Sequence, residues 1–292
     1  MNAEAGFNRE REPVRRVSPG CSPPEQNLTV TGRFIDVGDG KLYAHVRTGV
    51  GPALVFVHYW GGSHRTWTPV IQRIRALHPV VAYDQRGWGA SATVPGPYGL
   101  NQLADDALRV IEKCGLDSYV LVGHSMGGKA SQVLAARRPR GLVGVVLVAP
   151  APPMPVDISL EQRETFAHAY DNVDSVNRAI DGALTKSGLD PSFRSQVVED
   201  SLVGRGEVLS TWPKEALAQD ISDAVSAIDV PVLVLAGSHD EVDTPENLES
   251  NLLPYIRTAV MRRLIDTGHL SPLEVPDQIA AHLEEFMTKI DR

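Results

Sequence analysis

The stretch from Tyr119 to Ala130 reads YVLVGHSMGGKA and joins an apolar run to a pattern of helical spacing. The apolar run at 119–123 predicts a buried strand, and the residues from Ser125 onward predict a helix. Ser125 stands at their junction in the pattern Gly-X-Ser-X-Gly, which is typical of a nucleophilic serine on a sharp strand-to-helix turn. Glycines on both sides suit such a turn, because strand and helix approach closely there and leave no room for a Cβ.

Two interpretations of this turn are open from the residues alone. A serine at the beginning of a helix is well placed for chemistry, since the helix N-terminus favours a developing negative charge. The alternative is a tight Gly-Ser turn without a chemical role, because so short a pattern also arises by chance. The place directly between a predicted strand and a predicted helix favours a nucleophile at Ser125.

On both sides of this stretch, apolar runs of strand length alternate with helical patterns. A hairpin is expected from Leu28, because two alternating segments flank a Gly-Asp-Gly turn at 38–40. Further strands are expected at 53–57, 79–83, 143–148, 230–236 and 258–265, and further helices at 66–77, 101–114 and 276–290. This alternation predicts an α/β fold with a mostly parallel sheet flanked by helices.

A segment with helical patterning alone interrupts the alternation before the last two strands. It runs from about 159 to 220 and follows a proline-rich exit at 150–155. We therefore expect a helical cap over the carboxyl edge of the strands, where open α/β sheets place their sites. The predicted organisation is a flexible N-terminal segment at 1–27, an α/β core at 28–152 and 222–292, and a helical cap at 153–221.

Composition narrows the classes of function. The 292 residues carry a formal net charge of −8, which argues against nucleic-acid partners and against a polybasic membrane anchor. No apolar run approaches the roughly 20 residues that span a bilayer. The two cysteines, Cys21 and Cys114, form neither a disulfide framework nor a metal-binding spacing. We expect a cytoplasmic protein that acts on a small molecule without metal or cofactor; the sequence does not indicate an oligomeric state.

A serine hydroxyl needs a base to become a good nucleophile, and histidine is the usual one. When the serine follows a strand in this way, an acid and then the histidine come later in the chain. Only His269 and His282 lie beyond the last predicted strand. His282 sits within a predicted helix and is expected on its surface, whereas His269 follows Gly268 in a loop that can direct its ring. His269 is therefore the predicted base.

The acid is expected in the loop that follows the strand at 230–236. Three carboxylates compete there: Asp240, Glu241 and Asp243. Asp240 is nearest to the strand end and can reach an imidazole over the sheet edge, so it is the preferred acid. Asp243 precedes Thr244-Pro245 and is expected to cap the next helix. The amide of Met126, directly after the serine, is expected to form part of an oxyanion hole together with the loop after Val57.

These pieces together resemble the α/β-hydrolase superfamily, and in particular its capped serine esterases, enol-lactonases and cofactor-free haloperoxidase-like perhydrolases. The matching motifs are HYWGGS at 58–63, DQRGWGAS at 84–91, GHSMGG at 123–128, GSHDEVDTP at 237–245 and GHLSPLEVP at 268–276. The resemblance implies Ser125 as nucleophile, Asp240 as acid, His269 as base, and the amides of Trp60 and Met126 as the oxyanion hole. It implies a structural role for Asp84, Arg86, Gly87, Gly89 and Ser91.

Two features bear on the substrate. The family usually has glycine where this chain has Tyr59, so this side chain is expected either to line the acyl pocket or to reshape the oxyanion loop. Trp212 is the cap aromatic that we expect at the substrate, with the cap's own core as the alternative. Haloalkane dehalogenases and epoxide hydrolases of this fold carry aspartate as nucleophile, so Ser125 argues against both. Asp105 and Asp106 are expected on a solvated helix face.

The predicted function is hydrolysis of a carboxylic ester or lactone of a small to medium apolar substrate through an acyl-enzyme. The same residues would also serve perhydrolysis, C–C bond hydrolysis or acyl transfer, and the fold does not choose among them. A ligand-sensing or binding protein on a hydrolase scaffold is the alternative from another class.

Overall fold

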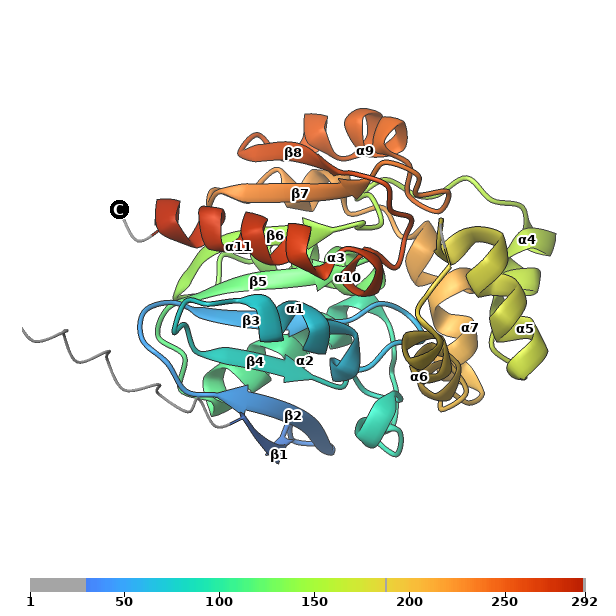
Figure 1. The fold of residues 1–292 in the computed structure, drawn as a ribbon, viewed down its shortest axis with the longest axis horizontal. Helices are drawn as coiled ribbons and strands as arrows, with labels where there is room; N and C mark the ends of the chain where they lie inside the picture. The colour runs from blue at the N-terminus through green and yellow to red at the C-terminus, as the bar shows by residue number, and fades with distance from the viewer. Residues whose placement is uncertain (1–29, 187, 291–292) are drawn as a thin grey trace, which may run out of the picture.

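The computed structural model describes residues 30–186 and 188–290. The predicted N-terminal segment 1–27 lies outside these residues. An eight-stranded sheet with the order β1-β2-β4-β3-β5-β6-β7-β8 forms the centre (Figure 1). The strands are β1 Val30–Asp36, β2 Lys41–Arg47, β3 Ala53–Val57, β4 Val80–Tyr83, β5 Tyr119–His124, β6 Leu142–Val148, β7 Val232–Gly237 and β8 Ala259–Leu264.

The burial of each strand depends on its place in the sheet and on the helices that cover it. Every residue of β3 and β5 is buried, as expected for parallel strands with helices on both faces. The hairpin strands β1 and β2 lie at the edge of the sheet and pair antiparallel, with Phe34 opposite Tyr43. They are less covered: β1 is exposed except at Ile35, and β2 buries only part of its residues. Since β2 also pairs antiparallel with β4 and the other pairs are parallel, the predicted mostly parallel sheet is confirmed.

Helices cover both faces of the sheet. In Figure 1, α1 (Thr68–Arg73) and α11 (Pro276–Ile290) lie in front of the strands, and α2 (Leu100–Lys113) and α3 (Met126–Ala136) lie behind them. Each pair closes its own buried apolar cluster on one face. The helix expected at 66–77 is shorter, because a 3-10 turn, η1 (His64–Trp67), precedes α1. Short elements complete the core: η2 Gly89–Ser91, α8 Ser222–Val225, α9 Pro245–Asn251, η5 Leu253–Tyr255 and α10 Ser271–Glu274.

One expectation about surface charge is wrong. Asp105 is half exposed, but Asp106 is buried in α2 against the guanidinium of Arg86. Nη2 of Arg86 lies 2.7 Å from Oδ1 of Asp106, and both side chains are removed from water. Two adjacent helix residues point about 100° apart, so one of them faces the core while the other faces solvent. The expected structural role of Arg86 agrees with this buried ion pair.

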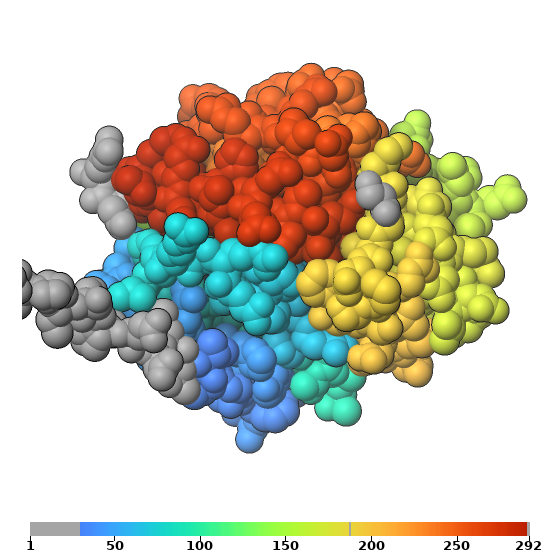
Figure 2. Space-filling model, in the orientation of Figure 1, coloured from blue at the N-terminus to red at the C-terminus, as the bar shows by residue number. Residues whose placement is uncertain are grey.

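Between β6 and β7 the chain forms helices, and the described residues of this segment include no strand. The helices are α4 Leu160–Ala167, α5 Val173–Ala179, the π-helical η3 Ile180–Leu184, α6 Pro191–Ser201, α7 Glu207–Lys214 and η4 Ala216–Ala218. We call residues 153–221 the helical insertion. It lies beyond the carboxyl ends of the strands, and Figure 2 shows it in yellow directly against the core. Among the described residues, none of the helices is long and apolar enough to cross a bilayer.

Candidate active site

Ser125 occupies the turn between β5 and α3 in a conformation that few side chains adopt. Its φ of 53° and ψ of −115° lie outside the ordinary regions, so the turn is strained and is held by its surroundings. A Cβ on Gly123 would approach the Gly127 carbonyl oxygen to 2.5 Å, and one on Gly127 would approach the His58 carbonyl oxygen to 2.4 Å. Both glycines are therefore required by close packing, as the sequence analysis expected.

The structure brings Ser125, His269 and Asp240 together from three loops at the carboxyl edge of the sheet. His269 Nε2 lies 2.9 Å from Ser125 Oγ, and His269 Nδ1 lies 2.9 Å from Oδ2 of Asp240. All three side chains are buried, with Ser125 the most accessible at 6%. Because Asp240 is an acceptor, Nδ1 carries the ring proton and Nε2 is left to accept the hydroxyl proton of Ser125. This arrangement is the one that activates a serine.

Among the three competing carboxylates, only Asp240 touches His269. Its second oxygen, Oδ1, accepts hydrogen bonds from the amides of Val242 and Asp243, which fix the carboxylate in the loop. Asp243 does not cap α9: the N-cap is Thr244, whose hydroxyl accepts from the amide of Asn247. Asp243 is instead buried beside the site, and burial raises the pKa of its carboxyl to about 8.

The loop that carries His269 is held by groups on its other sides. The Glu274 carboxylate accepts from the amide of Gly268, and the ring of His124 donates from Nε2 to the His269 carbonyl oxygen at 2.9 Å. Burial lowers the pKa of the His269 imidazole, but the charge of Asp240 and its hydrogen bond outweigh this, so the pKa lies above its ordinary value. Asp240 thus stabilises the protonated form of the His269 ring.

The two amides expected at an oxyanion belong to Met126, which directly follows Ser125, and to Trp60 in the loop after β3. Met126 is the first residue of α3, so its N–H has no partner within the helix. The Trp60 N–H and the Tyr59 carbonyl belong to the same peptide group. This carbonyl accepts hydrogen bonds from His58 Nδ1 at 2.7 Å and from the Gly62 amide at 3.1 Å. The two donors fix this peptide, and its N–H points away from its carbonyl. The amide of Gln85 donates to His58 Nε2, which settles the His58 tautomer.

Comparison with known proteins now decides the family. A model described as "Alpha/beta hydrolase family" matches residues 54–282, most of the chain. The chain belongs to the alpha/beta hydrolase family. It is 24% identical over 242 residues to the 3-oxoadipate enol-lactonase 2 of Acinetobacter baylyi. The match covers 82% of this chain and 90% of that protein. It is 26% identical over 276 residues to a non-heme haloperoxidase of Rhodococcus erythropolis, with 87% and 98% covered.

Solved structures agree on the fold of this hydrolase. An esterase from Exiguobacterium antarcticum superimposes with a TM-score of 0.77 at 18% sequence identity, and the match covers 88% of this chain and 100% of the esterase. At that identity the likeness concerns the fold. The resemblance predicted from the motifs to esterases, enol-lactonases and haloperoxidase-like proteins is confirmed by these comparisons.

The two side chains expected at the substrate have different surroundings in this hydrolase. Tyr59 is buried, and its ring packs 5.1 Å from the ring of His124. Burial raises the pKa of its hydroxyl well above the ordinary value, with Tyr170 and Asp200 of the helical insertion adding to this effect. Tyr59 belongs to the buried apolar cluster that also contains Tyr170 and Trp212 of the insertion. Trp212 is buried in the apolar cluster that the insertion shares with the core, and its contact with substrate stays a prediction.

Four site-facing residues carried no separate signal in the sequence. His58, His124 and Glu274 orient the loops around Ser125 through the hydrogen bonds described above. Lys129, one turn into α3, is fully buried, and its ammonium donates to the Leu217 carbonyl oxygen at 3.3 Å. Burial lowers the pKa of Lys129 to about 8. The sequence held one hint that Lys129 is buried: it directly follows Gly127-Gly128, a pair that packs closely. Within the described residues, no cluster of His, Cys, Asp or Glu is arranged to hold a metal ion.

Proposed function

We propose that this protein is a serine hydrolase that cleaves a carboxylic ester or lactone of a small to medium apolar substrate through an acyl-enzyme. The observation that carries the proposal is the hydrogen-bond chain from Ser125 Oγ through the His269 ring to Asp240, with 2.9 Å at both links. A chain of this kind at the N-terminus of a helix is what acyl transfer by serine requires.

In the first half of the reaction, Ser125 Oγ attacks the carbonyl carbon while its proton moves to His269 Nε2. Asp240 keeps the imidazole in the tautomer that can accept this proton and stabilises the resulting imidazolium. The amides of Trp60 and Met126 donate to the oxyanion of the tetrahedral intermediate. The intermediate collapses when His269 protonates the leaving alkoxide, and the acyl group stays on Ser125.

In the second half, His269 takes a proton from water, which attacks the acyl carbon. The second tetrahedral intermediate uses the same two amides. As it collapses, His269 returns the proton to Ser125 Oγ, the acid is released and Ser125 is restored. A lactone follows the same steps with the alcohol still tethered to the acyl group. No metal or cofactor is needed in these steps.

An apolar substrate is supported by the apolar side chains that the core and the helical insertion bury together. One buried cluster contains Met126, next to Ser125, and Trp60 of the core with Tyr170 and Trp212 of the insertion, and the rings of Trp60 and Tyr170 pack against each other. We propose that the insertion caps the site and that Trp212 contacts the substrate. The name of one relative, an enol-lactonase, supports the cleavage of a lactone.

The test is turnover of p-nitrophenyl butyrate together with labelling by a fluorophosphonate. We expect multiple turnovers and a single labelled residue, Ser125. The variant Ser125→Ala should lose at least about a thousandfold in kcat while remaining folded. Near-normal activity in folded Ser125→Ala, or one slow turnover with no further product, would exclude the proposed reaction; the second result would favour a ligand sensor.

A further inference from the structure

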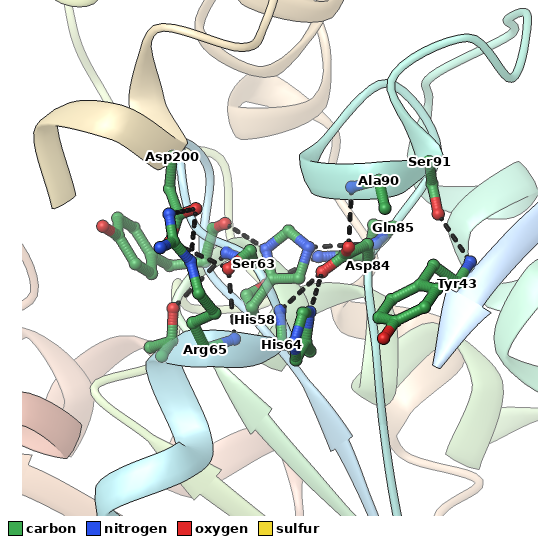
Figure 3. A network of polar contacts seen from close by, with 12 residues as sticks. Tyr43, His58, Ser63, His64, Arg65, Asp84, Gln85, Ala90, Ser91 and Asp200 are labelled. Atoms are coloured by element: carbon green, nitrogen blue, oxygen red, sulfur yellow. Dashed lines mark hydrogen bonds and ion pairs between the residues drawn. The ribbon is translucent and has the colours of Figure 1, made fainter. Parts of the chain in front are cut away.

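The loop that carries the Trp60 amide is held from the helical insertion. We call residues 58–65 the oxyanion loop. Asp200, near the end of α6, is 4% exposed and directs its carboxylate at this loop (Figure 3). Its Oδ2 accepts from Ser63 Oγ at 2.8 Å, and its Oδ1 accepts from Arg65 Nε at 3.1 Å and Nη2 at 2.6 Å. Both carboxylate oxygens are therefore bound to the loop.

The Ser63 hydroxyl links Asp200 to the backbone of the oxyanion loop. As the N-cap of η1, it also accepts from the amide of Arg65 at 3.1 Å. The direction of the hydroxyl therefore depends on Asp200 and in turn fixes the place where the oxyanion loop enters η1. A buried carboxylate that receives three hydrogen bonds from one short loop holds that loop more firmly than an exposed ion pair would.

Two more side chains of the insertion hold the middle of the loop. The Tyr170 hydroxyl donates to the Trp60 carbonyl oxygen at 3.2 Å, and Ser201 Oγ donates to the Gly61 carbonyl oxygen at 3.0 Å. Both side chains are buried. Two consecutive carbonyls of the oxyanion loop are thus fixed by the insertion, whereas the preceding carbonyl, that of Tyr59, is held by His58.

We propose that Asp200 is a positioning residue for the oxyanion hole, through which the helical insertion sets the direction of the Trp60 amide. The proposal rests on the proposed serine-hydrolase function and adds a role for the insertion besides covering the substrate. An oxyanion donor acts only when it already points at the place where charge develops. Because Asp200 contacts neither Ser125 nor the expected substrate carbonyl, it acts through the loop.

The test compares Asp200→Asn with Glu199→Gln. Asparagine keeps the size of the side chain but loses the charge that holds Arg65 and the second acceptor. Glu199 is the matched control, because it also accepts from Arg65, at 3.1 Å, but its side chain is 65% exposed and does not reach Ser63. The measurements are kcat and KM for p-nitrophenyl butyrate, inhibition by phenylboronic acid, and hydrogen exchange of the amides at 59–63.

We expect Asp200→Asn to lower kcat by about 10- to 100-fold, less than the loss of a whole oxyanion donor. The boronate forms a tetrahedral adduct on Ser125, so its inhibition constant should weaken by a similar factor, while KM stays within about threefold. The loop amides should exchange faster. Glu199→Gln should change each value by less than about twofold. Tyr170→Phe, which removes only the hydroxyl on the Trp60 carbonyl, should show the same pattern at about 3- to 10-fold and carries the test if Asp200→Asn does not fold.

Equal kcat in Asp200→Asn and Glu199→Gln would overturn the proposal. A loss of kcat without weaker boronate inhibition and without faster loop exchange would overturn it as well, since that pattern is general destabilisation. If the unaltered protein neither turns over the ester nor labels at Ser125, the proposed function fails; the exchange of the loop amides then still decides whether Asp200 holds the loop.

Discussion

Replacing Asp240 by asparagine should change the tautomer of His269 without changing the shape of the site. Oδ1 of Asp240 accepts from the amides of Val242 and Asp243, so the asparagine oxygen should remain on that side. Its NH2 group then faces His269 Nδ1 in place of Oδ2. Nδ1 becomes an acceptor, the ring proton moves to Nε2, and Nε2 can no longer accept the proton of Ser125.

The magnitude follows from that tautomer. In serine enzymes with the same geometry, the change from aspartate to asparagine costs about 10⁴-fold in kcat, or about 5.5 kcal/mol of transition-state stabilisation. Asp243 is three residues away and equally buried but touches neither ring nitrogen of His269. Asp243→Asn removes a carboxyl that burial already keeps largely protonated at neutral pH, because its pKa is raised to about 8. Its kcat should therefore fall by less than about tenfold.

The assay is kcat and kcat/KM for p-nitrophenyl acetate in both variants at about pH 7, below the pKa of Asp243, so that its carboxyl is largely protonated in the unaltered protein. Thermal unfolding shows whether each variant is folded. The two substitutions make the same exchange, a carboxylate oxygen for an NH2 group, at two nearby buried positions, so general damage should affect both alike. Losses of equal size, or a greater loss in Asp243→Asn, would refute the assignment of Asp240 as the partner of His269.

Three further results are expected. The kcat/KM should fall as the pH drops through the pKa of His269, with a midpoint above 6.5, because protonated Nε2 cannot act as base; a midpoint clearly below 6.5 would contradict the effect of Asp240. Lys129→Met should raise the free energy of unfolding at pH 7 by about 1–3 kcal/mol, since it removes a buried charge. Between pH 8 and 10.5 the folded state has lost the Lys129 proton and the unfolded state has not. The free energy of unfolding of the unaltered protein should therefore rise with pH in this window. An equal rise in Lys129→Met would show that Lys129 is not its cause. Tyr59→Gly should lower kcat/KM for p-nitrophenyl acetate, butyrate and octanoate alike, because Tyr59 is buried in the apolar cluster that the core and the insertion share. A selective gain for octanoate would instead place the Tyr59 ring in the acyl pocket.

Much of the fold was predictable because it depends on short-range patterns. Strands covered on both faces read as apolar runs, as at 53–57 and 119–123, and both runs became β3 and β5. Helix lengths were less accurate: α1 ends at Arg73, where the chain turns to an extended conformation that periodicity does not mark. Asp106 was misplaced because its burial depends on Arg86, which reaches it across the fold.

The sequence by itself determined the α/β alternation and the strand-to-helix turn at Ser125, since both depend on neighbouring residues, and it favoured Asp240 and His269 as the partners of Ser125. Only the tertiary structure placed the Asp240 carboxylate against His269 and buried Asp243 and Lys129. It also brought Asp200 onto Ser63, 137 residues away. Such contacts form where distant segments pack against each other, and the spacing of residues along the chain does not predict which buried polar groups will meet.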